Sequence, residues 1–361
     1  MGINESLPVD IRRSITTSFR TCQMAKSSAF DESRSLPTER SIDQQALCRQ
    51  LQSERFARRM LTHMHKDAAD AHLYDSAAKI AASARQCVSY QQAAASADLS
   101  VQPLLRYYAL LHWLKTILFA VDLGWPSTTT VLQHGVSVRR LKRAPYRWPF
   151  ETATLFKNGV LQSFWHVVCP DKEHPSRMTI GDLLGTLPSS AIAVGQIYPR
   201  FQHAYPLRLM SGIPGSTGYV ARAIASNQDL PVDQWRARFL AAHPAALPDN
   251  KPHTQFQPDP PGLLTLAVAD VNHPWIVHES DHLFVLDGAA PPPWACHCVL
   301  LFSLSALARY NPVEWSDIVT WNNEPDAYLV REYLASYSMD AVLASATAAC
   351  EETWALCSHL T

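Results

Sequence analysis

The chain has 361 residues, of which 47% are hydrophobic and 17% are charged, and its formal net charge is −1 at pH 7. This composition is typical of a globular protein with one large or two ordinary domains. The small net charge argues against a protein that coats DNA or another nucleic acid. The eight cysteines are scattered and no secretory signal precedes them, so we expect reduced thiols in a cytoplasmic protein.

Residues 1–40 are rich in Ser, Thr and Arg and lack helical or strand periodicity. We expect a disordered or loosely attached arm there. An amphipathic targeting peptide is the alternative, which the acidic residues of this stretch weaken. Residues 41–150 are expected to form an N-terminal helical region, which begins with two helices near Ile42–His65 and Asp67–Ala97.

The longest strongly apolar segment runs from Pro103 to Val121 and predicts a central helix that is buried on nearly all sides. Charged residues interrupt it, so we expect no membrane span. Tyr108, His112 and Lys115 lie at positions i, i+4 and i+7 and therefore share one face of this helix. A buried lysine is costly unless it is paired or faces a cavity. Two interpretations are open. Lys115 extends its ammonium group to solvent or pairs with a carboxylate, or this face of the helix contacts a ligand.

A turn, a hydroxyl-rich run and a basic run follow the central helix. Gly124 and Pro126 end the helix, and Ser127 or Thr128 is expected to cap a short helix that reaches His134 and ends at Gly135. A helix start of this kind suits an anion, and arginine side chains bind phosphate through two parallel hydrogen bonds. A solvated surface loop is the alternative interpretation. The basic residues are Arg139, Arg140, Lys142, Arg143 and Arg147.

Residues 151–290 are expected to hold hairpins, short helices and loops. Two strands at Ala153–Phe156 and Val160–Val168 are predicted on either side of Lys157-Asn158-Gly159, because Asn-Gly is a strong hairpin signal. A short helix is predicted at Thr179–Thr186, irregular chain at 188–218, a short helix at 232–242 and an exposed loop at 245–261. Further strands are predicted at Leu263–Val271, Trp275–Glu279 and His282–Leu286.

Residues 291–361 are expected to form a C-terminal helical region. Helices are predicted from Pro292 to Tyr310, from Pro312 to Thr320 and within Glu324–Cys357. The whole chain therefore predicts a mainly α fold with a small antiparallel β-element, an α+β arrangement in which the hairpins join one sheet between helical halves.

Two Arg-x4-His pairs have the spacing found in HEPN ribonucleases, namely Arg58 with His63 and Arg238 with His243. Chance produces about one match per chosen spacing in a chain of this composition, so the spacing alone is weak evidence. Two other clusters could hold a metal, but adjacent ligands on a helix diverge and polar strand ends explain the rest, so we expect no metal. These clusters are Cys296-His297-Cys298, and His273, His278 and His282 with Asp270, Glu279, Asp281 and Asp287.

The sequence contains no Walker loop, no GxGxxG and no Gly-x-Ser-x-Gly, and we expect no cofactor. The glycine-dense loop at 212–218 could bind an anion through backbone amides, although an ordinary loop explains it as well. Arg309 and Tyr310, with His297, could line a polar cavity; alternatively, Arg309 complements the dipole at the end of its helix.

Three blocks of sequence resemble the YaaC-like family of bacterial proteins. They are STTTVLQHGVSVRRLKR at residues 127–143, LFKNGVLQSF at residues 155–164, and LLFSLSALARYNPVEWSDI at residues 300–318. The resemblance runs from about Tyr74 to Tyr337. It implies a bacterial cytoplasmic protein whose genes often lie beside those of guanine-nucleotide synthesis, and it implies no particular catalytic residues.

We expect a non-catalytic regulator that senses a phosphorylated small molecule, most naturally a purine (guanine) nucleotide, and acts on a partner enzyme of nucleotide metabolism. The alternatives are a HEPN-like, metal-independent ribonuclease and a structural adaptor, and a homo-oligomer is left open. The expected ligand-binding residues are Tyr108, His112, Lys115, Ser127, Thr128, His134, Gly135, Arg139, Arg140, Lys142, Arg143, Arg309 and Tyr310.

Overall fold

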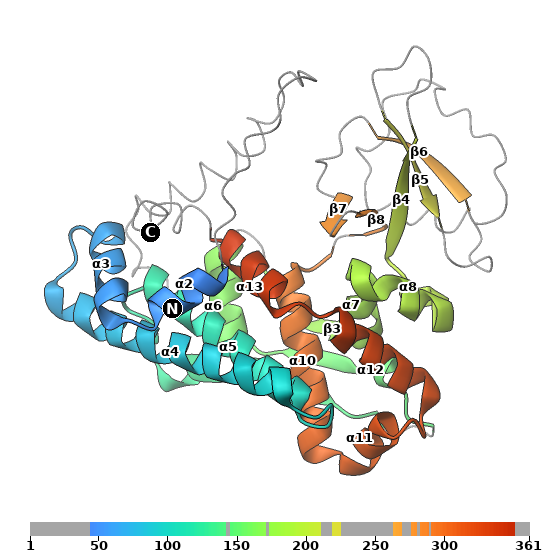
Figure 1. The fold of residues 1–361 in the computed structure, drawn as a ribbon, viewed down its shortest axis with the longest axis horizontal. Coiled ribbons are helices and arrows are strands. Elements are labelled where there is room, and N and C mark those ends of the chain that lie inside the picture. Colours follow the sequence, from blue (N-terminus) through green and yellow to red (C-terminus); the bar gives the residue numbers. More distant parts are fainter. Residues whose placement is uncertain are drawn as a thin grey trace.

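The computed structural model describes residues 44–141, 145–170, 173–210, 219–224, 263–268, 276–279, 282–288 and 290–350. Within these ranges the protein is mainly helical and carries two small antiparallel sheets (Figure 1), which confirms the predicted mainly α fold with small β-elements. The expected arm at 1–40, the short helix at 232–242 and the loop at 245–261 lie outside the described residues.

The N-terminal region contains α2 (Gln44–Leu51), α3 (Glu54–Met64) and α4 (Asp70–Ser96). The prediction of one helix over 42–65 is wrong, because the helix is interrupted between α2 and α3, and α3 begins anew after Ser53. The hydroxyl of Ser53 accepts a hydrogen bond from the backbone N–H of Phe56 at 3.4 Å and so caps α3. A serine at an N-cap satisfies an amide that would otherwise lack a partner, which favours a new helix start at this point.

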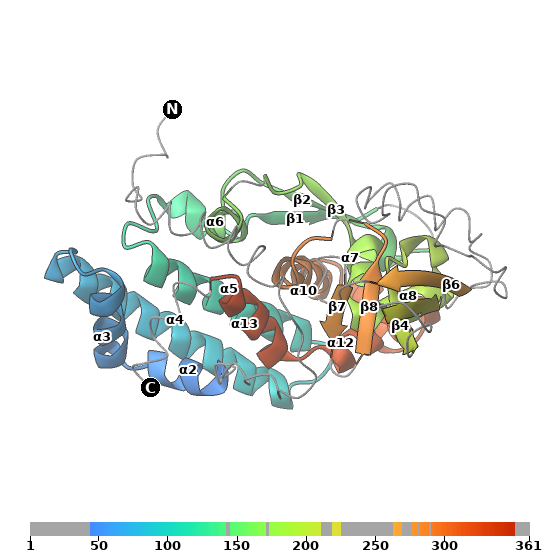
Figure 2. The ribbon, with the colours of Figure 1, turned by 90° about the horizontal axis from the view of Figure 1, so that it is seen from above.

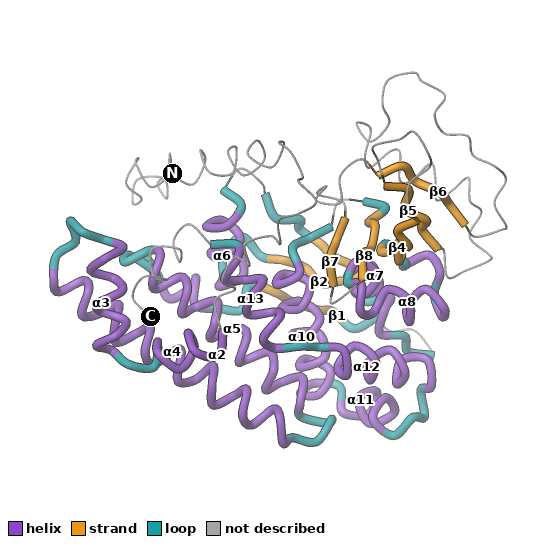
Figure 3. Tube along the Cα trace, turned by 45° about the horizontal axis from the view of Figure 1, so that its top comes forward, coloured by secondary structure: helices purple, strands orange, loops and turns teal. Residues whose placement is uncertain are grey.

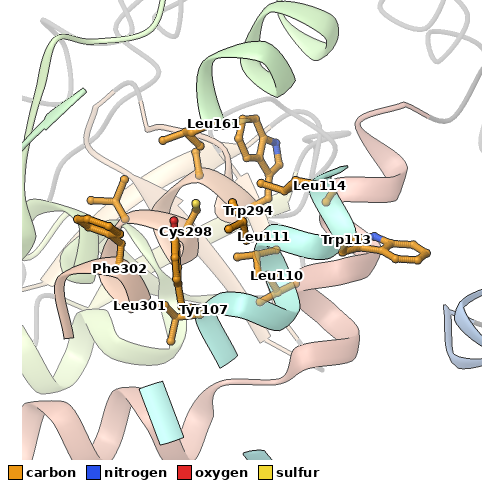
Figure 4. Close-up of a cluster of buried hydrophobic side chains, with 14 of the residues drawn as sticks. Tyr107, Leu110, Leu111, Trp113, Leu114, Leu161, Trp294, Cys298, Leu301 and Phe302 are labelled. Carbon is orange, nitrogen blue, oxygen red and sulfur yellow. The ribbon is translucent and has the colours of Figure 1, made fainter. Parts of the chain in front are cut away.

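The central helix α5 (Gln102–Val121) confirms the helix predicted over 103–121, and Pro103 lies in its first turn. It packs against α4 on one side and against α10 (Pro293–Tyr310) on another. Figure 4 shows Tyr107, Leu110 and Leu114 of α5 close to Trp294 and Phe302 of α10. Among the described residues, α5 alone is long and apolar enough to span a membrane. Its most apolar stretch is 67% buried inside the protein, as in a core helix.

A three-stranded sheet lies on the opposite side of α5 and α10 from α4 (Figure 2). It contains β1 (Val136–Arg139), β2 (Thr152–Leu155) and β3 (Arg177–Thr179) in the order β1-β2-β3. The predicted hairpin is wrong, because β2 pairs with β1, and residues after Gly159 form α6 (Val160–Val168) instead of a strand. The apolar residues of α6 recur at helical spacing and pack against α5, so tertiary burial outweighs the local Asn-Gly signal.

The region predicted as irregular contains regular structure. Helix α7 (Ile180–Thr186), which the sequence predicts, is followed by α8 (Pro188–Ile197) and β4 (Ala204–Met210), which it does not. Pro188 occupies the first turn of α8, where its missing N–H leaves no bond unmade, so proline favours a helix start here. Short 3-10 turns complete the connections at η1 (Thr129–Leu132), η2 (Trp148–Phe150) and η3 (Pro199–Phe201).

A second antiparallel sheet lies beside α7 and α8 at one end of the helical body (Figure 3). Its strand order is β6-β5-β4-β8-β7. The three strands predicted after residue 262 are present, the first two with shorter bounds and the third as predicted, but they form a sheet separate from β1–β3, which corrects the prediction of one sheet. The strands not yet given are β5 (Tyr219–Ile224), β6 (Leu263–Val268), β7 (Ile276–Glu279) and β8 (His282–Leu286).

The C-terminal region contains α10, α11 (Pro312–Val319), α12 (Glu324–Ser336) and α13 (Met339–Ala348). The last predicted helical segment is divided at Ser338, whose hydroxyl accepts a hydrogen bond from the N–H of Ala341 at 3.2 Å. The main hydrophobic core extends from Leu47 to Cys350 and draws on all three expected regions of the chain.

Candidate functional site

Between Tyr107 and Ala120 of α5, one face is half-buried and the remaining residues are buried. This face carries Tyr108, His112 and Lys115, as the helical spacing predicts. The ring of Tyr90 from α4 stacks on Tyr108 at a centroid distance of 5.3 Å and on His112 at 5.7 Å. The result is a row of three rings next to a lysine at the edge between α4 and α5.

His112 is held against α4 through Ser83. The Ser83 hydroxyl donates to the carbonyl oxygen of His112 at 2.9 Å, and its oxygen lies 3.2 Å from Nδ1 of the same histidine. Burial, reinforced by the charge of Lys115, lowers the pKa of His112 to about 4. The imidazole is therefore neutral at pH 7.

Lys115 has no ion pair and no hydrogen bond through its ammonium group to any residue in the part of the chain that the structure describes. Burial lowers its pKa from the usual value for lysine. A partly desolvated cation of this kind destabilises the fold unless a ligand or solvent compensates it. The described residues therefore supply no carboxylate partner for Lys115, which removes that part of the first interpretation of this face.

His134 reaches the same face from the segment between η1 and β1. Its Nδ1 lies 3.0 Å from the hydroxyl of Tyr107, and its ring packs against the rings of Tyr107, Tyr108 and Phe302 at centroid distances of 5.4, 6.1 and 5.6 Å. Burial lowers the pKa of His134, and the positive charges of Arg309 and Lys115 lower it further. Both cations therefore lie within electrostatic range of this ring.

Arg309 is in the last turn of α10, and its guanidinium donates to the carbonyl and hydroxyl oxygens of Ser305 at 3.0 and 3.2 Å. It also stacks on the ring of Tyr310 at 4.9 Å, and Tyr310 is 70% exposed. We call this group the cationic-aromatic site. It consists of Tyr90, Tyr107, Tyr108, His112, Lys115, His134, Phe302 and Arg309.

Gly135, next to His134, fixes the position of this histidine through close packing. Its φ is +81°, and a Cβ added there would lie 1.8 Å from Oε1 of Gln162. A Cβ on Gly159 would lie 2.4 Å from the Cα of Gly135, so the two backbones touch directly. Nε2 of Gln162 donates to the carbonyl oxygen of Gly135 at 2.8 Å. These contacts join the start of β1 to α6 and leave no room at Gly135 for a ligand.

The hydroxyl-rich run does not form the expected helix start. Ser127 and Thr128 are exposed, and the helix predicted from them to His134 is the four-residue turn η1, which has no side-chain cap. The prediction of a capped helix here is therefore wrong, and a single 3-10 turn aligns fewer backbone N–H groups toward an anion than the expected helix start.

The described members of the basic run are exposed or have partners other than a ligand. Arg139 is exposed at the end of β1 that is remote from His134, and Arg140 forms an ion pair with Glu314 of α11. Arg147 donates to the side-chain oxygen of Asn323 at 2.7 Å. Lys142 and Arg143 lie outside the described residues.

The residues of the ribonuclease alternative do not come together in the described structure. Arg58 and His63 are five positions apart on α3, about 140° around the helix. Arg58 stacks on Tyr74 at 4.4 Å, and both Arg58 and His63 are exposed. Arg238 and His243 lie outside the described residues.

The predicted metal candidates have other contacts where the structure describes them. Nδ1 of His297 lies 3.1 Å from the hydroxyl of Tyr333, and burial lowers the pKa of His297 to about 3. Burial raises the pKa of the Cys296 and Cys298 thiols to about 12, so both remain protonated. Of the later cluster, His273, Asp270 and Asp281 are outside the described residues, and nothing is described of the side chains of His278, Glu279 and His282.

Sequence reasoning missed a carboxylate–histidine–carboxylate cluster. Nδ1 of His203 lies 2.9 Å from Asp287 and Nε2 lies 3.0 Å from Asp182, so the ring links the end of β8 to α7. Burial acts to raise the pKa of Asp182, but the hydrogen bond and charge of His203 outweigh it and the pKa is lowered. This cluster connects the five-stranded sheet to the helical body.

A cleft of about 450 Å³ lies between residues 145–147 and the α11–α12 segment. Beneath it, Asp326 accepts hydrogen bonds from the backbone N–H of Trp148 at 2.7 Å and from the amide of Asn323 at 3.0 Å. Burial raises the pKa of Asp326 to about 6. The lining includes Glu314, Asp317 and Glu324, which disfavour an anion here.

These features define a helical protein with a half-buried cationic-aromatic site at its central helix. A model of the family described as YaaC-like Protein matches residues 49–342, most of the chain, and the chain belongs to this family. The resemblance seen in the sequence is thereby confirmed. No curated protein and no solved structure matches the chain.

Proposed function

We propose that the protein is a regulator that senses a phosphorylated small molecule, with guanine nucleotides as the expected class, and that the cationic-aromatic site binds it. The observation that carries this proposal is the position of two cations. The charges of Lys115 and Arg309 both lower the pKa of His134, and no carboxylate among the described residues opposes the lowering of the pKa at His134, His112 or Lys115. Partly buried cations without an acidic partner favour a phosphate.

The aromatic side chains support a ligand that carries a base. Tyr90 and Tyr108 form a stacked pair beside Lys115, and both are half-buried, so part of each ring faces solvent. Tyrosine rings offer a planar surface on which a purine stacks. The neutral imidazole of His112 lies in the same row and adds a polar edge.

Arg309 supports the regulatory part of the proposal. Its guanidinium lies within electrostatic range of His134 and also stacks on the exposed ring of Tyr310. A phosphate that recruits Arg309 would weaken this stacking and change the surface around Tyr310. We propose that a partner enzyme of nucleotide metabolism responds to that change.

Thermal unfolding and isothermal titration with guanine nucleotides test the proposal. A ligand at one hundred times its Kd stabilises the native state by about 2.7 kcal/mol. Lys115→Met and Arg309→Met should each weaken binding by about 10- to 100-fold, because each removes a charged hydrogen bond. Lys157→Met is the matched control, because Lys157 is exposed on the loop before α6.

Equal binding by all four proteins would contradict the proposed site, and no stabilisation by any nucleotide would contradict the proposed function. RNA cleavage that is lost in His63→Ala would support the ribonuclease alternative instead.

A further inference from the structure

The cationic-aromatic site has a defined balance of charge. Lys115 and Arg309 are its two cations, and burial keeps His112 and His134 neutral. Arg140 of the basic run is balanced by its ion pair with Glu314. A phosphate monoester carries about −1.5 to −2 charges at pH 7. Two cations therefore match one phosphate monoester, whereas a longer phosphate chain leaves unbalanced negative charge in a half-buried position.

His134 has one ring nitrogen in use and one available. Nδ1 lies 3.0 Å from the hydroxyl of Tyr107, and Nε2 has no hydrogen-bond partner among the residues that the structure describes. Burial raises the pKa of Tyr107 well above its usual value, so this side chain keeps its proton. A protonated hydroxyl can donate to the neutral imidazole or accept from the charged one. The surroundings of His134 therefore accommodate both forms of the ring.

We propose that the site selects ligands with a single phosphate monoester, and that His134 takes up one proton from solvent when the phosphate binds. The proton adds to Nδ1, the hydroxyl of Tyr107 rotates to accept from it, and Nε2–H donates to a phosphate oxygen. No covalent bond to the ligand forms or breaks. This inference rests on the proposed function and names the ligand class and the pH dependence of the same site.

Electrostatics explain why binding and proton uptake are coupled. In the free protein, burial and the charges of Arg309 and Lys115 lower the pKa of His134. Among the described residues, the rings that pack against it are the uncharged side chains of Tyr107, Tyr108 and Phe302. A bound dianion reverses the sign of the local potential, so the charged imidazolium becomes the favoured form. Affinity should therefore increase as pH falls from 8 to 7.

Isothermal titration at pH 7 tests both parts, with guanosine, guanosine monophosphate and guanosine triphosphate as probes. Each titration is repeated in two buffers that differ in ionisation enthalpy, which gives the number of protons taken up. We expect the monophosphate to bind at least about 10-fold more tightly than the triphosphate, which corresponds to about 1.4 kcal/mol. We expect uptake of roughly 0.5 to 1 proton per monophosphate, as for a histidine that becomes charged near pH 7.

His134→Gln should lose this uptake, and His63→Gln, at an exposed site on α3, should keep it. The buffer comparison on the unaltered protein does not depend on any variant folding. Tighter binding of the triphosphate, or monophosphate binding without proton uptake, would overturn this inference and leave the proposed function standing. If none of the phosphorylated probes binds, both fall together.

Discussion

The hydroxyl of Tyr107 lies 3.0 Å from Nδ1 of His134 and joins the buried side of α5 to the segment that precedes β1. Tyr107 is fully buried, and its ring also packs edge-on against Phe302 of α10 at 5.4 Å. One hydrogen bond therefore ties the hydrophobic core to a histidine at the half-buried face. This arrangement fixes the ring of His134 without using its second nitrogen.

Tyr107→Phe removes this hydrogen bond and keeps the ring packing. Loss of a single hydrogen bond at a half-buried histidine should lower the free energy of unfolding by about 1 kcal/mol. Urea unfolding measures this change. Ligand affinity should also fall, because His134 is no longer oriented. Tyr108→Phe is the matched control, since no hydrogen bond of its hydroxyl lies among those that the structure gives for the described residues, and it should leave the stability unchanged.

Lys115→Met should make the ligand-free protein more stable. Burial disfavours the charged form of Lys115, and methionine fills similar space without a charge. The expected gain is a few tenths to about 1 kcal/mol, because stability and function commonly oppose each other at binding sites. Thermal unfolding without nucleotide is the measurement. A clear loss of stability would show instead that the lysine has a structural role.

Gly135→Ala should destabilise the protein by at least about 2 kcal/mol. The φ of +81° is unfavourable for alanine, and the new methyl group would overlap with Oε1 of Gln162. Gly288→Ala is the control, because a Cβ there meets nothing within 4 Å. Its effect should stay within about 0.5 kcal/mol. Equal effects of the two substitutions in denaturant unfolding would rule out the close packing of β1 on α6.

Asp326 should make stability depend on pH between about 4 and 6. Burial raises its pKa from 3.8 to about 6, against the opposing hydrogen bonds of Trp148 and Asn323. The folded state therefore holds this proton more tightly than the unfolded state does. The stabilisation is fully present below pH 4 and is lost as pH rises through 6, by about 3 kcal/mol.

Urea unfolding of Asp326→Asn at several pH values isolates this contribution, since the amide does not titrate. The difference in stability between the original protein and the variant should change by this amount between pH 4 and 7. Glu324→Gln removes a carboxylate at an exposed neighbouring position and is the control. A constant difference for Asp326→Asn would contradict the raised pKa.

Helical periodicity predicted α5, α10 and the shared face of Tyr108, His112 and Lys115 correctly, because side-chain spacing directly determines which residues meet on a helix. The Asn-Gly signal at residues 158–159 was misleading, because burial of the following apolar residues favours α6. The density of positive charge also favoured the basic run as part of the ligand-binding site. Only the folded chain reveals that Arg140 is already paired with Glu314.

Three members of the site were not predicted. Tyr90 comes from the preceding helix α4 and Phe302 from the distant helix α10, so no spacing within α5 relates either residue to its half-buried face. Tyr107 lies beside Tyr108 but points into the core, about 100° around the helix. The cluster of Asp182, His203 and Asp287 was missed for the same reason, since a strand pairing brings its members together.

We propose that the anion binds at the half-buried face of α5 and not at the basic run. Equilibrium titration of guanosine monophosphate into the original protein, Lys115→Met and Arg140→Met tests it most directly. We predict a loss of about 10-fold or more for Lys115→Met and unchanged binding for Arg140→Met, whose charge is balanced by Glu314. The reverse result, with Lys115→Met unchanged and Arg140→Met weakened, would contradict the account and place the ligand at the basic run.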